Sequence, residues 1–327
     1  MEPTTRDEAT FTYSRLITLS HDELQEIVAS EPGKAAGLVE AAAKLGFVTA
    51  QMVWAQMLLD GIGTRQDQAA AFRWFEIAAV SRQPEALNML GRCHEVGWGC
   101  AVDYAEAARL YEEAAATGYD WAQFNLATLL FSGAGVTQDY REALALYVRA
   151  ARQGHAKAMT VIGRYREEGW TIRRCPSSAR QWYERAAKRG DFRAHYALAC
   201  MMRVAGNRAQ SLIHFEQAIE GGFPSFCRDI AADMLVDPDD EMRRLGRRAL
   251  ERACASGARD DFLRYAAALD EGIGGDPDNE VAAAWRCKAD AQMLKAGLKP
   301  HPRRRGRKGL VQVLLRRFTS PPCVRLL

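Results

Sequence analysis

The sequence predicts an all-α protein built from about seven tandem helix-turn-helix repeats. The main observation is a set of features that recurs every 36 residues through the middle of the 327-residue chain. A period in the thirties is typical of repeat arrays, in which each unit packs chiefly on its neighbours. Alanine is abundant at the recurring positions, and this residue favours closely packed helices. Glycine recurs where the first helix of each unit has to stop.

Four complete units follow one another without gaps. They span 50–85, 86–121, 122–157 and 158–193, and each begins with alanine. Eleven residues later each unit has a glycine: Gly61, Gly97, Gly133 and Gly169. Because glycine readily adopts the left-handed conformation that ends helices, we expect the first helix to stop there. The second helix is expected to begin near a residue whose side chain can cap it, namely Asp67, Asp103, Asp139 or Ser177.

Weaker units flank these four. We expect a repeat region over 21–296 that also contains a degenerate unit at 22–49 and irregular units at 194–225, 226–260 and 261–296. Terminal repeats are usually atypical because one of their faces meets water. Within the first unit, Lys34–Leu45 is expected to form a helix after a break at Pro32-Gly33. Residues 1–20 are expected to be disordered.

The C-terminal segment 297–327 forms a strongly basic tail. Residues 295–327 carry ten Lys and Arg and no Asp or Glu, so the formal net charge of +3 leaves −7 for residues 1–294. A short amphipathic helix is expected over 309–318, because Leu310, Leu314 and Phe318 share one helical face. The tail could cap the last repeat, stay disordered, lie on an anionic membrane or bind nucleic acid. Its basic patch consists of Arg303, Arg304, Arg305, Arg307, Lys308, Arg316 and Arg317.

The N-terminal segment, the length of the apolar runs and the cysteine spacing together predict a cytoplasmic protein. No basic start followed by an apolar segment marks a secretory signal, and no apolar run is long enough to span a bilayer. The eight cysteines include no Cys-x-x-Cys pair, so we expect reduced thiols in the cytosol.

No set of residues points to an enzyme. The sequence lacks the phosphate-loop, serine-hydrolase and zinc-protease motifs, and the Gly-x-Gly elements are expected to be turns between helices. His94 with Cys93 and Cys100 is the one His/Cys cluster, but a metal site would need further ligands. We therefore expect a non-enzymatic protein with no cofactor, no metal and no small-molecule substrate.

The pattern resembles the Sel1-like repeat family. The unit at 122–157 carries Ala122, Leu126, Gly133-x-Gly135, Ala143, Leu146-Tyr147, Ala150-Ala151 and Gly154 at the family's spacing. The resemblance implies a right-handed α-solenoid related to tetratricopeptide arrays, acting as an adaptor or scaffold for other proteins. The sequence departs from the family where Tyr of the first helix is replaced by Leu58, His94, Leu130 and Arg166.

By analogy with tetratricopeptide arrays, the first helix of each unit would line a concave groove that holds a protein partner. Positions three, seven and ten of each unit would face it. In chain order, unit by unit, these residues are Met52, Gln56 and Leu59; Asn88, Arg92 and Glu95; Phe124, Thr128 and Phe131; Thr160, Arg164 and Glu167; and Tyr196, Cys200 and Arg203.

Two interpretations of these groove positions stay open. Asn88 with Arg92, and Lys157 with Arg164, could hold a carboxylate of the partner, because a guanidinium can donate two parallel hydrogen bonds. Alternatively, Arg92 pairs with Glu95 on a solvated face. Phe124 and Phe131 could anchor a partner side chain or simply pack between repeats. We expect a monomer whose membrane or nucleic-acid contacts, if any, use only the tail.

Overall fold

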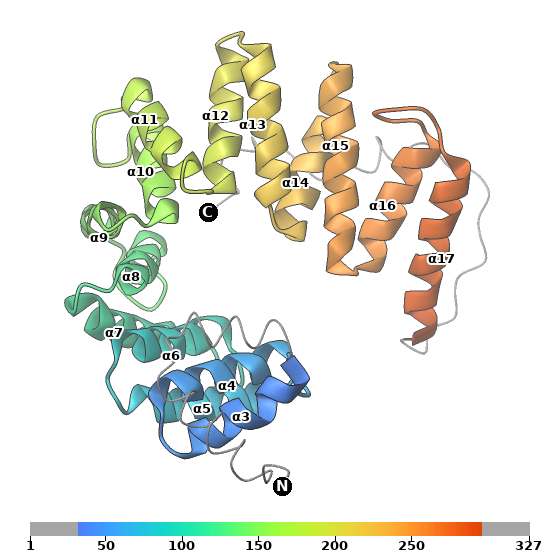
Figure 1. The fold of residues 1–327 in the computed structure, drawn as a ribbon. Helices are drawn as coiled ribbons and strands as arrows, with labels where there is room; N and C mark the ends of the chain where they lie inside the picture. Colours follow the sequence, from blue (N-terminus) through green and yellow to red (C-terminus); the bar gives the residue numbers. More distant parts are fainter. Residues whose placement is uncertain (1–31, 296–327) are drawn as a thin grey trace, which may run out of the picture. The chain divides into compact units, whose positions relative to one another are not determined.

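The computed structural model describes residues 32–295, and this part of the protein is entirely helical (Figure 1). It contains fifteen α-helices, one 3-10 helix and no strand. The predicted all-α repeat fold is confirmed. The expectations for residues 1–31 and 296–327, including the N-terminal disorder, the helix at 309–318 and the basic patch, lie outside the described residues.

After a leading helix, the helices alternate as first and second members of pairs. The leading helix is α3 (Pro32–Lys44). The first members are α4 (Val48–Asp60), α6 (Pro84–Val96), α8 (Asp120–Ser132), α10 (Ala156–Glu168), α12 (Phe192–Val204), α14 (Pro224–Met234) and α16 (Arg259–Asp270). The second members are α5 (Gln68–Ala79), α7 (Tyr104–Ala116), α9 (Tyr140–Arg152), α11 (Pro176–Ala187), α13 (Arg208–Gly221), α15 (Asp240–Ala253) and α17 (Asn279–Lys295). The 3-10 helix Cys254–Ser256 follows α15.

The ends of these helices follow local backbone rules. Gly61, Gly97 and Gly133 end α4, α6 and α8 in the left-handed conformation, with φ of 71°, 82° and 73°. The carboxylates of Asp67, Asp103 and Asp139 accept hydrogen bonds from backbone N–H groups at the starts of α5, α7 and α9. These predicted stops and caps are therefore confirmed.

Two predicted helix starts were wrong by one or two residues, and proline explains both. Ser177 was expected to cap α11, but it lies inside that helix, which begins at Pro176. The helix α3 begins at Pro32, two residues before the expected Lys34. Proline suits the first helical position because its φ is already helical and it has no N–H to leave unpaired.

The second glycine of each Gly-x-Gly turn allows a close approach between repeats. A Cβ on Gly99 would lie 2.1 Å from the carbonyl oxygen of Gln68, and one on Gly135 would lie 2.3 Å from the carbonyl carbon of Tyr104. Both partners lie at the start of the preceding second helix. The glycines are thus turn and packing residues.

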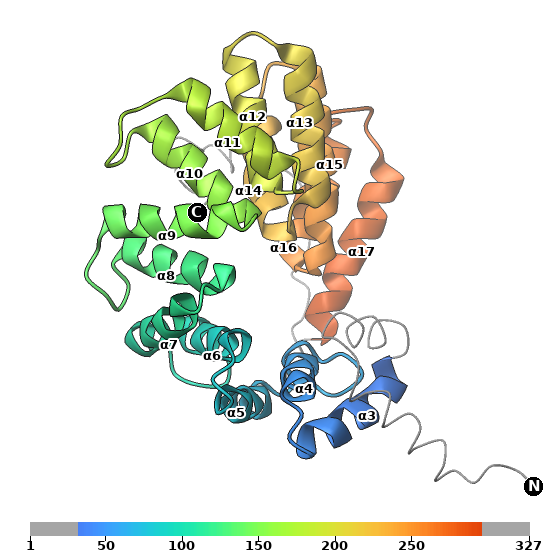
Figure 2. The same ribbon diagram turned by 60° about the vertical axis from the view of Figure 1, so that its left-hand side comes forward.

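The protein divides into two compact units, residues 1–158 and 159–327. In the first, α6, α7, α8 and α9 pack consecutively (Figures 1 and 2), and its fully buried large side chains include Phe75, Tyr111 and Tyr147. In the second, α12 packs on α13, α14 on α15 and α16 on α17, around a core that includes Phe215 and Ile219.

Ion pairs join α14 and α15 to their neighbours in the second unit. Arg203 on α12 contacts Asp237 at 2.6 Å, and Arg208 at the start of α13 contacts Asp239, the residue before α15, at 2.6 Å. Both pairs are largely exposed at the arginine. Arg228 on α14 instead makes two 2.5 Å hydrogen bonds to Asp261 on α16, whose side chain is 0% exposed.

Candidate functional site

Three predicted groove residues hold buried tyrosines of the second helices. Tyr111 donates a hydrogen bond to Glu95 at 2.6 Å, and Tyr183 donates one to Glu167 at 2.7 Å. In the repeat between them, the Tyr147 hydroxyl is 3.1 Å from the Thr128 hydroxyl. Burial raises the pKa of Tyr111 and of Tyr183, and the adjacent carboxylate raises each pKa further. These first-helix residues therefore satisfy polar atoms that would otherwise be buried without a partner.

The arginines at position seven lie against tryptophans of the following turns. The Arg92 guanidinium lies 4.8 Å from the ring centre of Trp98, and that of Arg164 lies 5.8 Å from Trp170. These distances are those of cation–π contacts, which hold a guanidinium against the face of the ring. Asn88 is buried and accepts a hydrogen bond from Asn125 at 2.8 Å.

The predicted aromatic positions of α8 lie among other rings of the first unit. Phe124 stacks on His155 at 4.7 Å between ring centres and lies 5.6 Å from Tyr147. Phe131 meets Tyr140 edge to face at 5.1 Å. Both phenylalanines are half-buried. Each contact joins the first and second helices of a repeat or the turn that follows.

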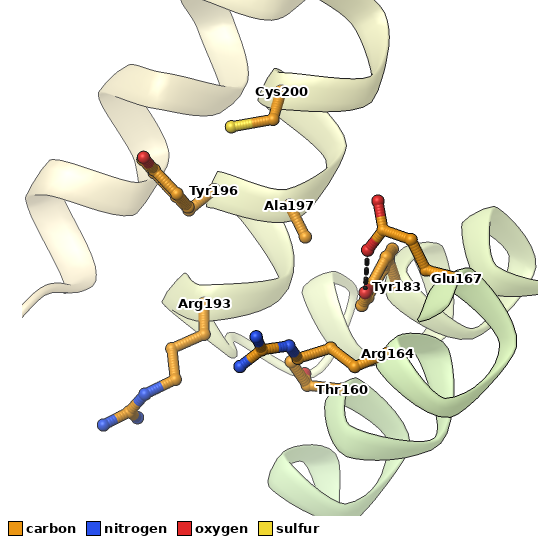
Figure 3. Close-up of a pocket in the computed structure, with 8 residues that line it drawn as sticks. All are labelled: Thr160, Arg164, Glu167, Tyr183, Arg193, Tyr196, Ala197 and Cys200. Carbon is orange, nitrogen blue, oxygen red and sulfur yellow. Dashed lines mark hydrogen bonds between the residues drawn. The ribbon is translucent and has the colours of Figure 1, made fainter. Parts of the chain in front are cut away.

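The second unit contains a depression of about 470 Å³ between α10, α11 and α12, here called the arginine depression (Figure 3). It brings together five of the residues expected at positions three, seven and ten. Its lining consists of Thr160, Arg164, Glu167, Tyr183, Arg193, Tyr196, Ala197 and Cys200. In Figure 3 Arg164 extends from α10 toward α12, on which Arg193 and Tyr196 project.

Arg193 was missed by the sequence analysis although the sequence contains a signal for it. Arg193, Tyr196, Ala197 and Cys200 follow the i, i+3, i+4, i+7 spacing that places residues on one helical face. The repeat unit was taken to begin at Ala194. Counting positions three, seven and ten from that residue leaves out Arg193, which precedes it.

The arginine depression contains two basic side chains and one acidic side chain. The Arg164 side chain is buried, and the Arg193 guanidinium carbon lies 4.5 Å above the Phe192 ring. Burial lowers the pKa of Arg193 while Asp191 acts in the opposite direction, and an arginine stays protonated at neutral pH. The one lining carboxylate, Glu167, accepts a hydrogen bond from Tyr183. Two guanidinium groups and the Thr160 hydroxyl, all of them hydrogen-bond donors, thus line the same depression.

A second depression of about 900 Å³ lies in the first unit and has a different character. Met52 and Gln56, expected at positions three and seven, line it together with the thioether of Met89 and the ring of Phe75. Its other lining residues are Thr49, Gln83, Glu85 and Tyr119. With no basic side chain in this lining, the second depression suits apolar groups and amides rather than anions.

Arg203 does not belong to either depression. It is exposed and forms the ion pair with Asp237 described above. The tail residues of the predicted basic patch lie outside the described residues. Five of the predicted positions therefore line the arginine depression, two line the second depression, and others make packing contacts or ion pairs.

A histidine pair lies on α12 and α13. The Nδ1 atoms of His195 and His214 are 2.9 Å apart, so one ring must donate its proton to the other. Burial lowers the pKa of both rings, and for His195 the proximity of His214 lowers it further. Glu184 acts in the opposite direction on His214, and Asp191 does so on His195.

We expect this histidine pair to make stability fall as the pH is lowered from 7.5 to 5.5. In the unfolded protein the two histidines have a pKa of about 6.5, whereas in the folded protein the pKa of each is lower. Below about pH 6.5 the unfolded protein therefore binds more protons than the folded protein does, and protonation favours unfolding. The measurement is the free energy of unfolding in urea at each pH. A variant with His195→Gln and His214→Gln should lose less stability over this range; an equal loss would contradict the prediction.

The cluster at the end of α6 has no metal-site geometry. Cys100 Sγ lies 4.0 Å from His94 Nδ1, whereas Cys93 is buried, and burial raises its pKa to about 12. Such a thiol stays protonated and is a poor metal ligand. Over residues 32–295, no group of three or more His, Cys, Asp or Glu is placed to hold a metal ion. In the same range, no helix has the length and apolar character that crossing a membrane requires.

The helix pairs and their spacing define an α-helical repeat protein of the solenoid type. The Sel1 repeat model matches residues 39–79, 84–119, 122–155, 156–191, 193–223 and 263–289. These segments cover more than half of the chain, which therefore belongs to the Sel1 repeat family. The helices α14 and α15 form a further pair in a region that the model does not match.

Three solved structures are similar to this chain, and the first of them, with a TM-score above 0.5, shares its fold. A Sel1 repeat protein from Oxalobacter formigenes is 22% identical with a TM-score of 0.52, over 84% of this chain and 100% of that protein. A protective antigen of uropathogenic Escherichia coli with an SLR fold is 25% identical, with a TM-score of 0.43 over 81% of this chain and 65% of its own length. An immunity protein of Pseudomonas aeruginosa is 14% identical, with a TM-score of 0.47 over 78% and 89%. A comparison with curated proteins gives no significant match.

Proposed function

We propose that this protein is a non-enzymatic adaptor that binds a protein partner, and that the arginine depression holds an acidic group of that partner. Sel1 repeat proteins generally mediate protein–protein interactions and are generally not enzymes. The observation that supports the site is the convergence of Arg164, Arg193 and Thr160 around one open depression. The carboxylate of an Asp, of a Glu or of a polypeptide's last residue fits these donors, because it accepts paired hydrogen bonds from a guanidinium.

The proposed binding mode uses donors that are already positioned. Arg164 lies against Trp170 and Arg193 against Phe192, so little side-chain freedom remains to be lost on binding. Tyr196 and Ala197 supply apolar surface beside the guanidinium groups. The partner segment we envisage therefore places an acidic group next to an apolar side chain. A monomer acting in the cytoplasm belongs to the same proposal, and light scattering checks the monomeric state.

We expect Arg164→Ala and Arg193→Ala each to weaken binding of an acidic peptide at least about tenfold. Loss of a hydrogen bond to a charged group costs roughly 1.5–3 kcal/mol, and about 1.4 kcal/mol corresponds to a factor of ten. The probe is an acidic peptide selected from a displayed peptide library by its binding to the full-length protein. Fluorescence anisotropy gives the Kd. The same peptide with its acidic residues changed to amides should bind the unaltered protein with similarly reduced affinity.

The matched control is Arg189→Ala, which removes the same charge from an exposed position outside the arginine depression. Its Kd should stay within about twofold of the unaltered protein, because exposed charges at a distance are screened by salt. If Arg189→Ala weakens binding as much as Arg164→Ala, the effect is one of net charge. The proposed site would then be wrong.

A further inference from the structure

The final helix, α17, exposes a row of apolar side chains beside Lys288, an exposed residue whose ammonium lies over the Trp285 ring. Val281 is 40% exposed and Leu294 is 64% exposed, and Ala284, Cys287 and Ala291 are exposed between them. The spacing of these five residues, mostly three and four apart, places them on one side of the helix. We call this set the α17 stripe. The opposite side of α17 carries the buried Ala282 and Ala289, and the helix packs on α16.

The α17 stripe differs from the corresponding surface of an internal repeat. When Trp285 is aligned with Leu110 of α7, Ala284 and Cys287 correspond to Arg109 and Glu112, both exposed and charged. Ala283 corresponds to Ala108, which is 4% exposed in α7, a helix that packs against the next repeat. In α17 the residue Ala283 is exposed. The last helix thus has apolar residues where an internal helix meets water, and it lacks the cover that an internal helix receives.

We propose that residues 309–318 of the same polypeptide bind to the α17 stripe. The sequence continues for 32 residues beyond α17, and within them Leu310, Val311, Leu314, Leu315 and Phe318 recur at helical spacing. The small side chains of Ala284, Cys287 and Ala291 would let a second helix approach closely. Each apolar residue that leaves water contributes to binding, and because the segment is tethered the association is intramolecular.

The length of the connecting segment permits this return. An extended segment 296–308 spans about 40 Å, whereas α17 is about 25 Å long. Residues 309–318 can therefore run antiparallel along the stripe, starting near Leu294. The linker crosses the C-terminal end of α17, where the helix dipole favours the cations of 303–308.

Charge also favours the binding of residues 309–318 to the α17 stripe. In an antiparallel arrangement that starts near Leu294, Arg316 and Arg317 lie about 11 Å along α17, on the way to its N-terminal end, where Glu280 is exposed. The ten basic residues of 295–327 complement the net charge of −7 on the rest of the protein. Attraction between them raises the local concentration of the tail near the acidic body.

Cys287 reports whether the stripe is covered. We expect N-ethylmaleimide to label Cys287 at least about tenfold more slowly in the full-length protein than in a truncated protein ending at residue 296. Cleavage before aspartate releases the peptide 278–289, so mass spectrometry follows this thiol apart from Cys323. Cys175, in the second unit but outside α17, serves as the internal reference and should label at the same rate in both proteins.

Two variants of the full-length protein test the same contact without the risk that a truncated protein misfolds. Leu314→Asp places a charge on the proposed contact face and should raise the Cys287 labelling rate to that of the truncated protein. Gln312→Asp adds the same charge off that face and should leave the slow rate unchanged. Equal labelling of Cys287 in the full-length and truncated proteins would overturn the proposal.

Three other results would overturn it as well. Protection of Cys287 that increases with protein concentration would assign the stripe to a second copy of the protein. Protection that appears only with phosphatidylserine vesicles would assign the tail to a membrane, and protection only with duplex DNA would assign it to nucleic acid. None of these results bears on Arg164 and Arg193, so the proposed peptide site stands or falls separately.

Discussion

Replacing Arg228 by methionine is expected to destabilise the second unit by about 3–5 kcal/mol, the cost typical of leaving a buried charge without its partner. Asp261 is 0% exposed and receives two 2.5 Å hydrogen bonds from Arg228 and one of 2.6 Å from Ser256. Burial alone would raise the pKa of Asp261, yet the hydrogen bonds from Arg228 and Ser256 hold it below its usual value. Without Arg228, the carboxylate must be protonated or stay charged without the two hydrogen bonds that a cation donates to it.

The comparison that tests this explanation is Arg203→Met. Its pair with Asp237 is similarly short at 2.6 Å, but the arginine side chain is 53% exposed. An exposed pair contributes at most about 1 kcal/mol, so this variant should unfold at nearly the same urea concentration as the unaltered protein. Adding Asp261→Asn to Arg228→Met should restore part of the lost stability because it removes the buried charge. If both arginine variants lose equal stability, burial is not the cause.

Gly163→Ala is expected to cost about 1–3 kcal/mol, although alanine favours helices more than glycine does. A Cβ at this position would lie 2.4 Å from the Tyr183 ring, closer than any normal contact. Tyr183 is 0% exposed and its hydroxyl is bonded to Glu167, so the ring has little room to move. The midpoint of urea unfolding measures the effect.

The matched control for this prediction is Gly37→Ala in α3. A Cβ there would meet nothing within 4 Å, so this variant should be stabilised by up to about 1 kcal/mol. In a Tyr183→Leu background, Gly163→Ala should lose most of its cost, because the two changes act on one contact. A Gly163→Ala protein as stable as the parent would show that α10 and α11 adjust freely.

Some parts of the candidate site could be predicted from the sequence, and others could not. The 36-residue step placed Thr160, Arg164 and Glu167 on one helix face, and the next unit added Tyr196 and Cys200. Arg193 was missed because it precedes the formal start of its unit, although it shares the face of Tyr196. That Glu95 and Glu167 face a partner stays a prediction, and the structure adds that their carboxylates accept hydrogen bonds from buried tyrosines of the second helix.

The sequence by itself determined the repeat period, the helix stops at Gly61, Gly97 and Gly133 and the caps at Asp67, Asp103 and Asp139. These features depend on backbone conformation and on hydrogen bonds within a few residues, so the local sequence is sufficient. Only the tertiary structure decided that Asp261 is buried while Asp237 is partly exposed, and that Arg193 joins Arg164. Burial and convergence depend on residues about thirty positions apart, and the local pattern carries no record of those distances.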